Sequence, residues 1–310
     1  MHLPVQDVMP SPAARQAARV SIVVPLFNEE QVVERVVERL LGLGIPECEF
    51  LLVDDGSRDG TWACIQQLAR EHEPLIGIRL SRNFGQQAAL LCGYRAAAGE
   101  AVICLDADLQ DPPEVIPRML AAWQAGADVV VAVRAARDGD SIFKRATAWL
   151  YYRLLAQLSD RPSAVDAGDF RLLSRRALEA LLALEGSEAL LRGAVGWTGF
   201  PTTTIEYERA PRAAGRTKYR LRDMLRLARE GIFATERGPV VLGHTAAALG
   251  LAAAALSAGL GAAWLAAFSL ALPLLVYLAI AVEYSALIAR RSLRRPAYLV
   301  REIVGKRHDA

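Results

Sequence analysis

Five short apolar runs, each followed by polar residues and a helical pattern, constrain the fold of this chain more than any other feature of its sequence. Continuously apolar strands that alternate with helices are typical of a parallel sheet covered on both faces. The sequence therefore predicts an α/β fold with a Rossmann-like, mostly parallel sheet. The runs are Val20–Pro25, Phe50–Val53, Leu75–Leu80, Ala101–Leu105 and Asp128–Val133.

Helices are expected between these runs, and two further strands after them. The first helix is predicted to begin after Asn28, whose side chain can cap a helix N-terminus. The further strands are expected at Phe170–Leu173 and Thr203–Tyr207. The predicted helices are Glu29–Leu41, Thr61–His72, Gln86–Ala98 and Glu114–Gln124.

Polar side chains gather just after the predicted strands. Asp54 and Asp55 end the second run, Asn83 follows the third, and Asp106 and Asp108 follow the fourth. Ligands bind at the carboxyl ends of the strands in open parallel sheets. These residues are therefore expected to share one rim of the sheet.

The Asp106-Ala107-Asp108 segment suggests a divalent cation site at this rim. Mg²⁺ and Mn²⁺ prefer carboxylate oxygens, and Mg²⁺ commonly takes one or two protein carboxylates together with substrate phosphates. Taken alone, an Asp-x-Asp pair is also common in surface turns, and Asp55-Gly56 is ordinary turn chemistry. The two acidic segments within one βα series favour the functional interpretation.

A run of 45 residues without a formal charge, Gly238–Val282, indicates membrane association. It is long enough for two helices of about 20 residues, each able to cross a hydrocarbon layer of ~30 Å. Gly259–Gly261 is the expected turn, and a proline such as Pro273 is tolerated in a lipid-embedded helix. The alternative is a very apolar buried hairpin in a soluble protein. Arginines flank both ends of the run, which predicts a multi-pass inner-membrane protein with both flanks in the cytoplasm.

The segment before the first expected span has the pattern of a basic amphipathic helix. Lys218, Arg222, Arg226 and Arg229 share one face of a helix over Thr217–Phe233. Such a helix beside a membrane attracts anionic lipid or phosphate, whereas a solvated surface helix is the plainer alternative.

Composition narrows the remaining classes of function. The net charge of +2 argues against nucleic-acid binding, and the four cysteines lack the spacing of a zinc site or disulfide framework. An aromatic helical pattern around Trp149 is consistent with self-association into a homo-oligomer.

Six motifs in order give the chain a family resemblance. It is similar to the polyprenyl-phosphate glycosyltransferases of glycosyltransferase family 2, the group of bactoprenol glucosyltransferase and dolichol-phosphate mannose synthase. The resemblance covers Val20–Tyr219 and resumes weakly after the second span. The motifs read VSIVVPLFNEE, LLVDDGSRDGT, LSRNFGQQAALLCGYRAAAGE, VICLDADLQDPPE, DAGDFRLLSRRAL and AGRTKY.

This resemblance implies a GT-A fold and inverting transfer of a sugar from a nucleotide sugar to polyprenyl phosphate, with Mg²⁺ or Mn²⁺ as cofactor. A UDP-hexose is the expected donor, and GDP-mannose is the alternative. Two rivals are a processive polysaccharide synthase and a non-catalytic membrane scaffold. The first is expected to carry a Gln-x-x-Arg-Trp motif, and none of the five tryptophans stands in one.

The resemblance also implies residue roles. Asp106, Asp108, Asp169 and Arg171 would be catalytic. The metal would be held by Asp106, Asp108 and Gln110. Phosphate of the donor or acceptor would meet Arg192, Arg216, Thr217 and Lys218. Nucleotide contacts would come from Pro25, Phe27, Asn28, Glu29, Asp54, Asp55, Asn83, Gly85 and Ala107.

The predicted organisation has five parts. They are an N-terminal extension (1–19), a GT-A catalytic domain (20–215), a basic juxtamembrane helix (216–237), a transmembrane hairpin (238–288) and a basic cytoplasmic tail (289–310).

Overall fold

The computed structural model describes residues 18–134, 167–184, 195, 198–208, 238–259, 263–292 and 296–305. These residues fall into two compact units, one built on a β-sheet and the other containing α10 (Gly238–Gly259) and α11 (Ala263–Ser292). Several predicted features lie outside the described residues: the basic helix over Thr217–Phe233, the aromatic helix near Trp149, and the phosphate-binding candidates Arg192, Arg216, Thr217 and Lys218.

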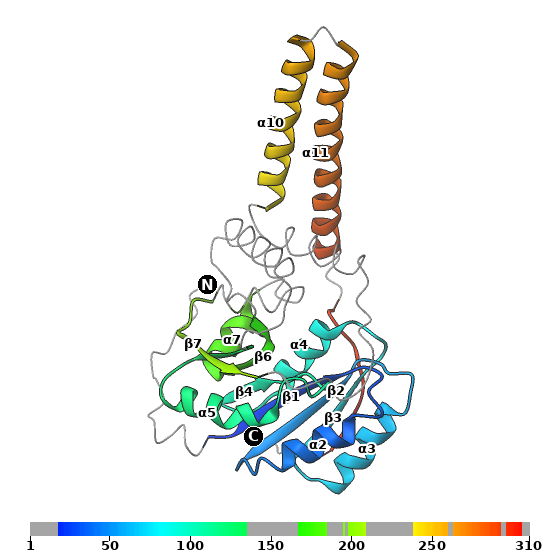
Figure 1. Cartoon of the computed structure of the whole chain (residues 1–310). Coiled ribbons are helices and arrows are strands. Elements are labelled where there is room, and N and C mark those ends of the chain that lie inside the picture. Colours follow the sequence, from blue (N-terminus) through cyan, green and yellow to red (C-terminus); the bar gives the residue numbers. More distant parts are fainter. Residues whose placement is uncertain are drawn as a thin grey trace. The chain divides into compact units, whose positions relative to one another are not determined.

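The first unit is an eight-stranded sheet in the order β7-β5-β6-β4-β1-β2-β3-β8 (Figure 1). Its centre is parallel, because β1 pairs in parallel with β2 and β4, and β2 does so with β3. The strands are β1 (Val20–Leu26), β2 (Cys48–Asp54), β3 (Leu75–Leu80), β4 (Ala101–Cys104), β5 (Val129–Arg134), β6 (Ala167–Ser174), β7 (Thr202–Tyr207) and β8 (Val300–Val304).

Helices cover both faces of this sheet, as the continuously apolar strands require. Successive β1 residues face opposite layers: Ile22 and Val24 belong to one buried cluster and Val23 to the other. One face carries α2 (Val33–Leu41), α3 (Thr61–Glu71) and α5 (Ile116–Gln124), which follows the short 3₁₀ turn η1 (Pro113–Val115); the other carries α4 (Gln86–Ala96) and α7 (Arg175–Ala183).

A glycine lets α4 approach the sheet closely. A Cβ atom on Gly93 would lie 2.2 Å from Cγ1 of Val23 in β1, so any larger residue would push the helix away. The close packing fixes the N-terminal end of α4, which begins at Gln86, beside the carboxyl ends of the strands.

The start of the first helix differs from the prediction. Asn28 does not cap α2, which begins at Val33 after Val32. Asn28 instead has a backbone φ of +55°, a left-handed conformation that asparagine tolerates better than most residues. Its side-chain oxygen accepts a hydrogen bond from the Arg58 N–H in the loop after β2, and four residues separate Asn28 from the start of α2.

The seven predicted strands are all present, and β8 is an additional one. It lies in the segment expected to be a tail and pairs antiparallel with β3 at the edge of the sheet. This strand was not predicted, because Val300–Val304 is short and carries two charged residues.

In the second unit, α10 and α11 pack against each other through small residues on α10. A Cβ on Gly250 would lie 2.0 Å from Cγ of Pro273, and one on Gly243 would lie 2.8 Å from the Tyr277 ring. Small residues at a helix–helix contact allow close backbone approach. Length and composition identify one described helix segment, Ala267–Ala286 in α11, as able to cross a membrane. The two-span hairpin remains a prediction.

Candidate active site

The loops after β1 and β2 are locked together at the rim of the sheet. Asp54 is fully buried, and its Oδ1 accepts a hydrogen bond from the Ser57 N–H at 3.0 Å. The Ser57 hydroxyl in turn accepts one from the Asn28 N–H at 2.9 Å. The Asn28 side-chain oxygen accepts from the Arg58 N–H, also at 2.9 Å. The left-handed Asn28 thus fixes the shape of both loops.

The other predicted nucleotide residues of β1 lie at the same edge. Pro25 is half-buried in the strand, and the Phe27 side chain is 41% exposed just beyond it. The Glu29 N–H donates to the Thr61 hydroxyl at 2.9 Å, which joins this loop to the start of α3. An exposed aromatic ring beside two loops can stack on a base, and the nucleotide-binding role of Phe27 remains a prediction.

Asp55 holds the loop that precedes α4. Its two carboxylate oxygens accept hydrogen bonds from the N–H groups of Phe84 at 2.7 Å and Gly85 at 2.8 Å. Burial raises the pKa of Asp55, and these two hydrogen bonds oppose the rise. Gly85 has a φ of +102°, which strains any residue with a side chain. Asp55 and Gly85 therefore shape the turn into α4, and Asn83 lies exposed on the same turn.

Gln86, which the sequence analysis did not single out, joins two of the predicted catalytic carboxylates. Its Nε2 donates to Asp106 Oδ1 at 2.8 Å and lies 3.3 Å from Asp169 Oδ2. Gln87 Nε2 also reaches Asp169, at 3.4 Å. The Oε1 atom of Gln87 is buried with no hydrogen-bond partner in the described part of the chain. The start of α4 thus supplies two amides to the acidic rim.

Sheet register explains why Asp169 reaches Asp106. Strands β4 and β6 are antiparallel, with Cys104 opposite Arg171. Asp106 lies two residues beyond Cys104, and Asp169 lies two residues before Arg171, so both come to the same end of the pair. Asp169 and Arg171 are buried on one face of β6 and form an ion pair at 3.6 Å. The structure therefore brings Asp106 together with Asp169 and Arg171, which lie more than 60 residues further along the chain.

The segment after β4 forms a tight turn. Ala107 is buried, Leu109 has a φ of +55°, and the Gln110 N–H donates to Asp108 Oδ1 at 3.1 Å. This turn keeps the Asp108 carboxylate next to the end of β4. The predicted role of the Gln110 side chain as a metal ligand remains a prediction.

A second group of polar residues follows this turn and was also missed by the sequence analysis. Asp111 is buried; it accepts a hydrogen bond from the Tyr207 hydroxyl and lies 3.6 Å from the Arg134 guanidinium. Arg134 Nε also donates to the Tyr207 oxygen at 3.3 Å. The three residues come from the β4–α5 loop, β7 and β5. They tie the Asp-x-Asp turn to the far side of the sheet.

Tyr207→Phe is expected to lower the free energy of unfolding by about 1–3 kcal/mol, because buried Asp111 loses a hydroxyl donor. Burial and the hydrogen bond to Asp111 raise the pKa of Tyr207 to about 12. A raised pKa gives stability that is complete below the unfolded value near ~10 and is lost as pH rises toward the folded value. The free energy of unfolding, measured at several pH values between 9 and 12, should therefore fall more steeply with pH for the parent than for the variant. Equal slopes would contradict this role.

The donor set at this rim suits a hard divalent cation. Two carboxylates, Asp106 and Asp108, stand two residues apart at the end of a buried strand. Among the residues that the structure describes, no group of three or more His, Cys, Asp or Glu side chains forms a complete metal cage. Mg²⁺ does not need such a cage, because it takes one or two carboxylates and completes its shell with phosphate oxygens and water. The residues present therefore fit Mg²⁺ or Mn²⁺.

Comparison with known proteins identifies the family. The profile of the family described as Glycosyl transferase family 2 matches residues 21–182, just over half of the chain. A bactoprenol glucosyl transferase of Shigella phage SfV is 40% identical over 217 residues, which cover 69% of this chain and 71% of that protein. The glycosyltransferase YkcC of Bacillus subtilis is 41% identical over 236 residues, covering 74% of this chain and 72% of YkcC.

Solved structures share the fold of the first unit. A crystal structure of glucosyl-3-phosphoglycerate synthase from Mycobacterium tuberculosis, in complex with Mn²⁺, UDP and phosphoglyceric acid, aligns with a TM-score of 0.52 and 20% identity over 74% of this chain and 82% of that one. Another complex of the same enzyme aligns with a TM-score of 0.50 and 21% identity, over 75% of this chain and 84% of that one. These likenesses show a GT-A fold.

The resemblance drawn from the six motifs is thus confirmed by the profile and by the sequence relatives together. This chain belongs to glycosyltransferase family 2, and it is an enzyme that transfers a sugar from a nucleotide sugar.

Proposed function

We propose that this protein transfers a hexose from a UDP-hexose donor to polyprenyl phosphate at the cytoplasmic face of the membrane. The observation that carries the proposal is the convergence of Asp106 and Asp169 on Gln86, beside the loops fixed by Asp54 and Asp55. The relatives named as bactoprenol glucosyl transferases support a lipid phosphate as the acceptor.

The proposed reaction does not require a strong general base. A phosphate monoester is already anionic near neutral pH, so the acceptor oxygen needs no proton removed by the protein. The larger task is to stabilise the charge that builds on the departing nucleoside diphosphate. A divalent ion held by Asp106 and Asp108 would act as a Lewis acid toward that diphosphate. The in-line displacement at the anomeric carbon inverts its configuration.

The remaining residues of the rim would bind and orient the donor. Phe27 offers an exposed ring to the base, and the ordered Asp54 and Asp55 loops frame the nucleoside. Asp169 is held beside Asp106 by the side-chain amides of Gln86 and Gln87, where its carboxylate can accept hydrogen bonds from hydroxyl groups of the sugar. Arg171 forms an ion pair with this buried carboxylate at 3.6 Å and helps to hold it in place.

The second unit supports a lipid-facing location. Large apolar side chains of α10 and α11 are exposed, including Leu249 at 73%, Trp264 at 74% and Leu274 at 71%. Exposed apolar surface along entire helices is typical of membrane contact and not of a soluble core. We propose that both helices span the inner membrane and that the enzyme assembles as a homo-oligomer there.

A donor screen tests this function. The full chain in detergent is incubated with short-chain polyprenyl phosphate and a series of UDP- and GDP-sugars, and the released nucleoside diphosphate is measured. We expect release with one UDP-hexose, dependent on polyprenyl phosphate and abolished by EDTA, then restored by Mg²⁺ or Mn²⁺. Release of GDP from GDP-mannose, and of no UDP from any UDP-sugar, would show that GDP-mannose is the donor and that the proposed UDP-hexose is wrong.

A thermal-shift measurement separates the enzyme from a non-catalytic scaffold. UDP with Mn²⁺ is expected to raise the unfolding temperature of the enzyme, since a ligand that binds only the folded state stabilises it. A scaffold would show no shift with any nucleotide and no product in the screen.

A further inference from the structure

We propose that Glu302, on the C-terminal strand β8, is a positioning residue for nucleotide binding. It acts through Trp62 and Arg79 on the buried carboxylate of Asp54. This inference rests on the proposed role of the Asp54 loop in binding the nucleotide.

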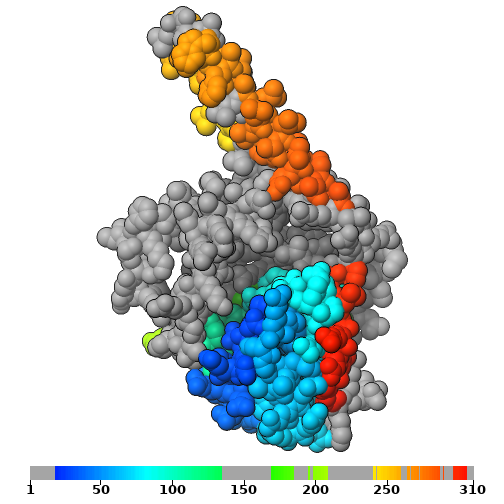
Figure 2. Space-filling view, turned by 90° about the vertical axis from the view of Figure 1, so that its right-hand side faces the viewer, coloured from blue at the N-terminus to red at the C-terminus, as the bar shows by residue number. Residues whose placement is uncertain are grey.

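Strand β8 completes the sheet next to the nucleotide half of the fold. It pairs antiparallel with β3, with Gly77 opposite Val304 and Arg79 opposite Glu302, and the Ser81 N–H donates to the Leu299 carbonyl at 2.8 Å. Figure 2 shows this strand in red along the edge of the unit, beside the segments in blue and cyan. Residues 296–305 of the predicted tail are therefore part of the catalytic unit.

The sequence makes specific room for this strand. A Cβ atom on Gly77 would lie 2.7 Å from Cγ2 of Val304 and 2.5 Å from Cγ2 of Ile65 in α3. Only glycine at this position lets Val304 and α3 approach β3 together. The packing brings Glu302 within reach of the side chains of α3.

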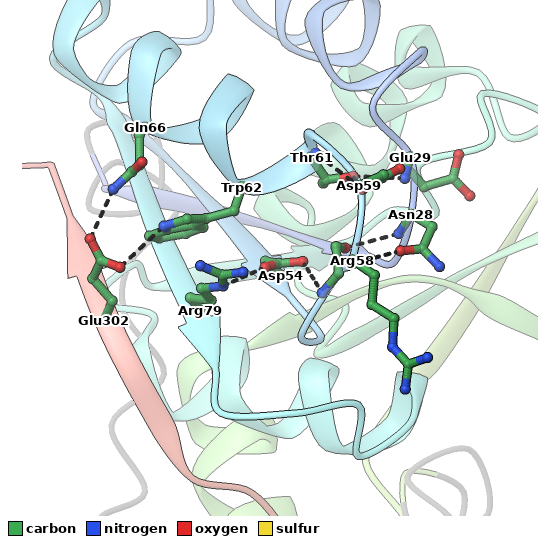
Figure 3. A network of polar contacts seen from close by, with 11 residues as sticks. Asn28, Glu29, Asp54, Arg58, Asp59, Thr61, Trp62, Gln66, Arg79 and Glu302 are labelled. Carbon is green, nitrogen blue, oxygen red and sulfur yellow. Dashed lines mark hydrogen bonds and ion pairs between the residues drawn. The ribbon is translucent and has the colours of Figure 1, made fainter.

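Glu302 uses both of its carboxylate oxygens on α3. Oε2 accepts a hydrogen bond from Trp62 Nε1 at 3.2 Å, and Oε1 accepts one from Gln66 Nε2 at 2.8 Å (Figure 3). Hydrogen bonds to a charged acceptor are stronger than neutral ones. Together they fix the plane of the Trp62 ring.

The Trp62 ring in turn lies against the cation that pairs with Asp54. The Arg79 guanidinium carbon lies 5.6 Å from the ring centroid, and Arg79 Nε lies 3.3 Å from Asp54 Oδ2. Asp54 is fully buried, and its Oδ2 has no hydrogen-bond partner among the described residues. The ion pair with Arg79 therefore offsets the cost of burying this oxygen. A buried carboxylate depends strongly on such a partner.

Asp54 carries the effect to the rim. Its Oδ1 atom accepts a hydrogen bond from the Ser57 N–H, and the Ser57 hydroxyl accepts one from the Asn28 N–H. The Arg79 and Glu302 positions are cross-strand partners with opposite charges, which favours the same arrangement. A continuous series of contacts therefore runs from the C-terminal tail to the loop proposed to meet the nucleotide.

Glu302→Gln in the full chain is the central test. Glutamine keeps one acceptor oxygen and turns an NH₂ group toward the second donor. We expect the Kd for UDP with Mn²⁺ and the KM for the nucleotide sugar to rise about tenfold, the lower end of the loss seen when an outer-shell partner of a metal ligand is removed. kcat and the KM for polyprenyl phosphate should change less than about twofold. Arg301→Gln, an exposed neighbour on the same strand, is the matched control and should behave as the parent.

A double-mutant cycle distinguishes positioning from a general loss of structure. In an Arg79→Ala background, Glu302→Gln should raise the Kd for UDP by less than about twofold. The reason is that the Arg79–Asp54 ion pair, through which Glu302 is proposed to act, is already absent. Trp62→Phe keeps an aromatic ring at this position, although a smaller one, and removes the indole N–H; it should weaken UDP binding in the same direction while the protein stays folded. Additive effects of Glu302→Gln and Arg79→Ala, or a Glu302→Gln protein that binds UDP as the parent does, would overturn the proposal. Failure of the parent itself to bind UDP would instead overturn the proposed function.

Discussion

Replacing Asp108 with Asn is expected to lower the rate of sugar transfer by on the order of 10²–10³-fold, the scale on which loss of a group that stabilises transition-state charge is felt. Asparagine matches the shape of the side chain and can still accept the Gln110 N–H that holds the turn, so the fold should be kept. It lacks the negative charge that would attract a divalent cation to the leaving diphosphate. The effect should therefore fall on kcat.

The measurement is nucleoside diphosphate release from the full chain in detergent, with saturating donor and polyprenyl phosphate. Glu71→Gln removes an exposed carboxylate at the end of α3 and serves as the control for lost charge. Parent-like turnover of Asp108→Asn at low Mn²⁺ would exclude the assigned metal role.

Replacing Asp55 with Ala is expected to reduce both stability and nucleotide affinity. The N–H groups of Phe84 and Gly85 would lose their carboxylate partner, and each donor left unsatisfied costs about 1–3 kcal/mol, less where water can enter. We expect a loss of about 2–4 kcal/mol in the free energy of unfolding. The Kd for UDP should rise about tenfold or more, because the turn that places Gln86 beside Asp106 is no longer held.

Denaturant unfolding and calorimetric titration with UDP measure the two effects. Asp55→Asn is the milder variant, since one amide oxygen can still accept one of the two N–H groups. Asp59→Ala changes an exposed aspartate in the same loop, which accepts hydrogen bonds from Thr61 and from the Glu30 N–H instead of the Phe84–Gly85 turn, and it should weaken UDP binding much less than Asp55→Ala does. An Asp55→Ala protein with parental stability would show that the loop is held by other contacts.

The order of strands and helices in the catalytic unit was predictable because the local pattern and the tertiary environment agree. The apolar runs at β1 to β5 are buried on both faces, so their composition directly reports their place in the sheet. The starts of α3 and α4 were also predicted correctly, whereas the start of α2 was not. The residues from Asn28 to Val32 carry good capping and helix-forming types, but hydrogen bonds to the β2 loop hold Asn28 in a left-handed conformation.

The rim of acids was also predictable in part. Asp54, Asp55, Asp106 and Asp108 follow strands that are parallel, and the carboxyl ends of parallel strands meet at one edge. Gln86 carries no such signal, since a glutamine at the start of a helix is ordinary. Its importance depends on the close packing of α4 on Val23 and on the turn held by Asp55. Asp169 came from the family motif, and only the antiparallel β4–β6 register shows why it belongs beside Asp106.

The sequence by itself determined the layered α/β unit, the acidic edge and the two long apolar helices, because each depends on burial patterns and charges that repeat locally along the chain. Tertiary structure alone decided which distant groups meet: Gln86 with Asp106 and Asp169, Asp111 with Tyr207, and Glu302 with Trp62. The physical reason is that such contacts depend on strand register and on helix packing to within an ångström, and neither is written in any short stretch of residues.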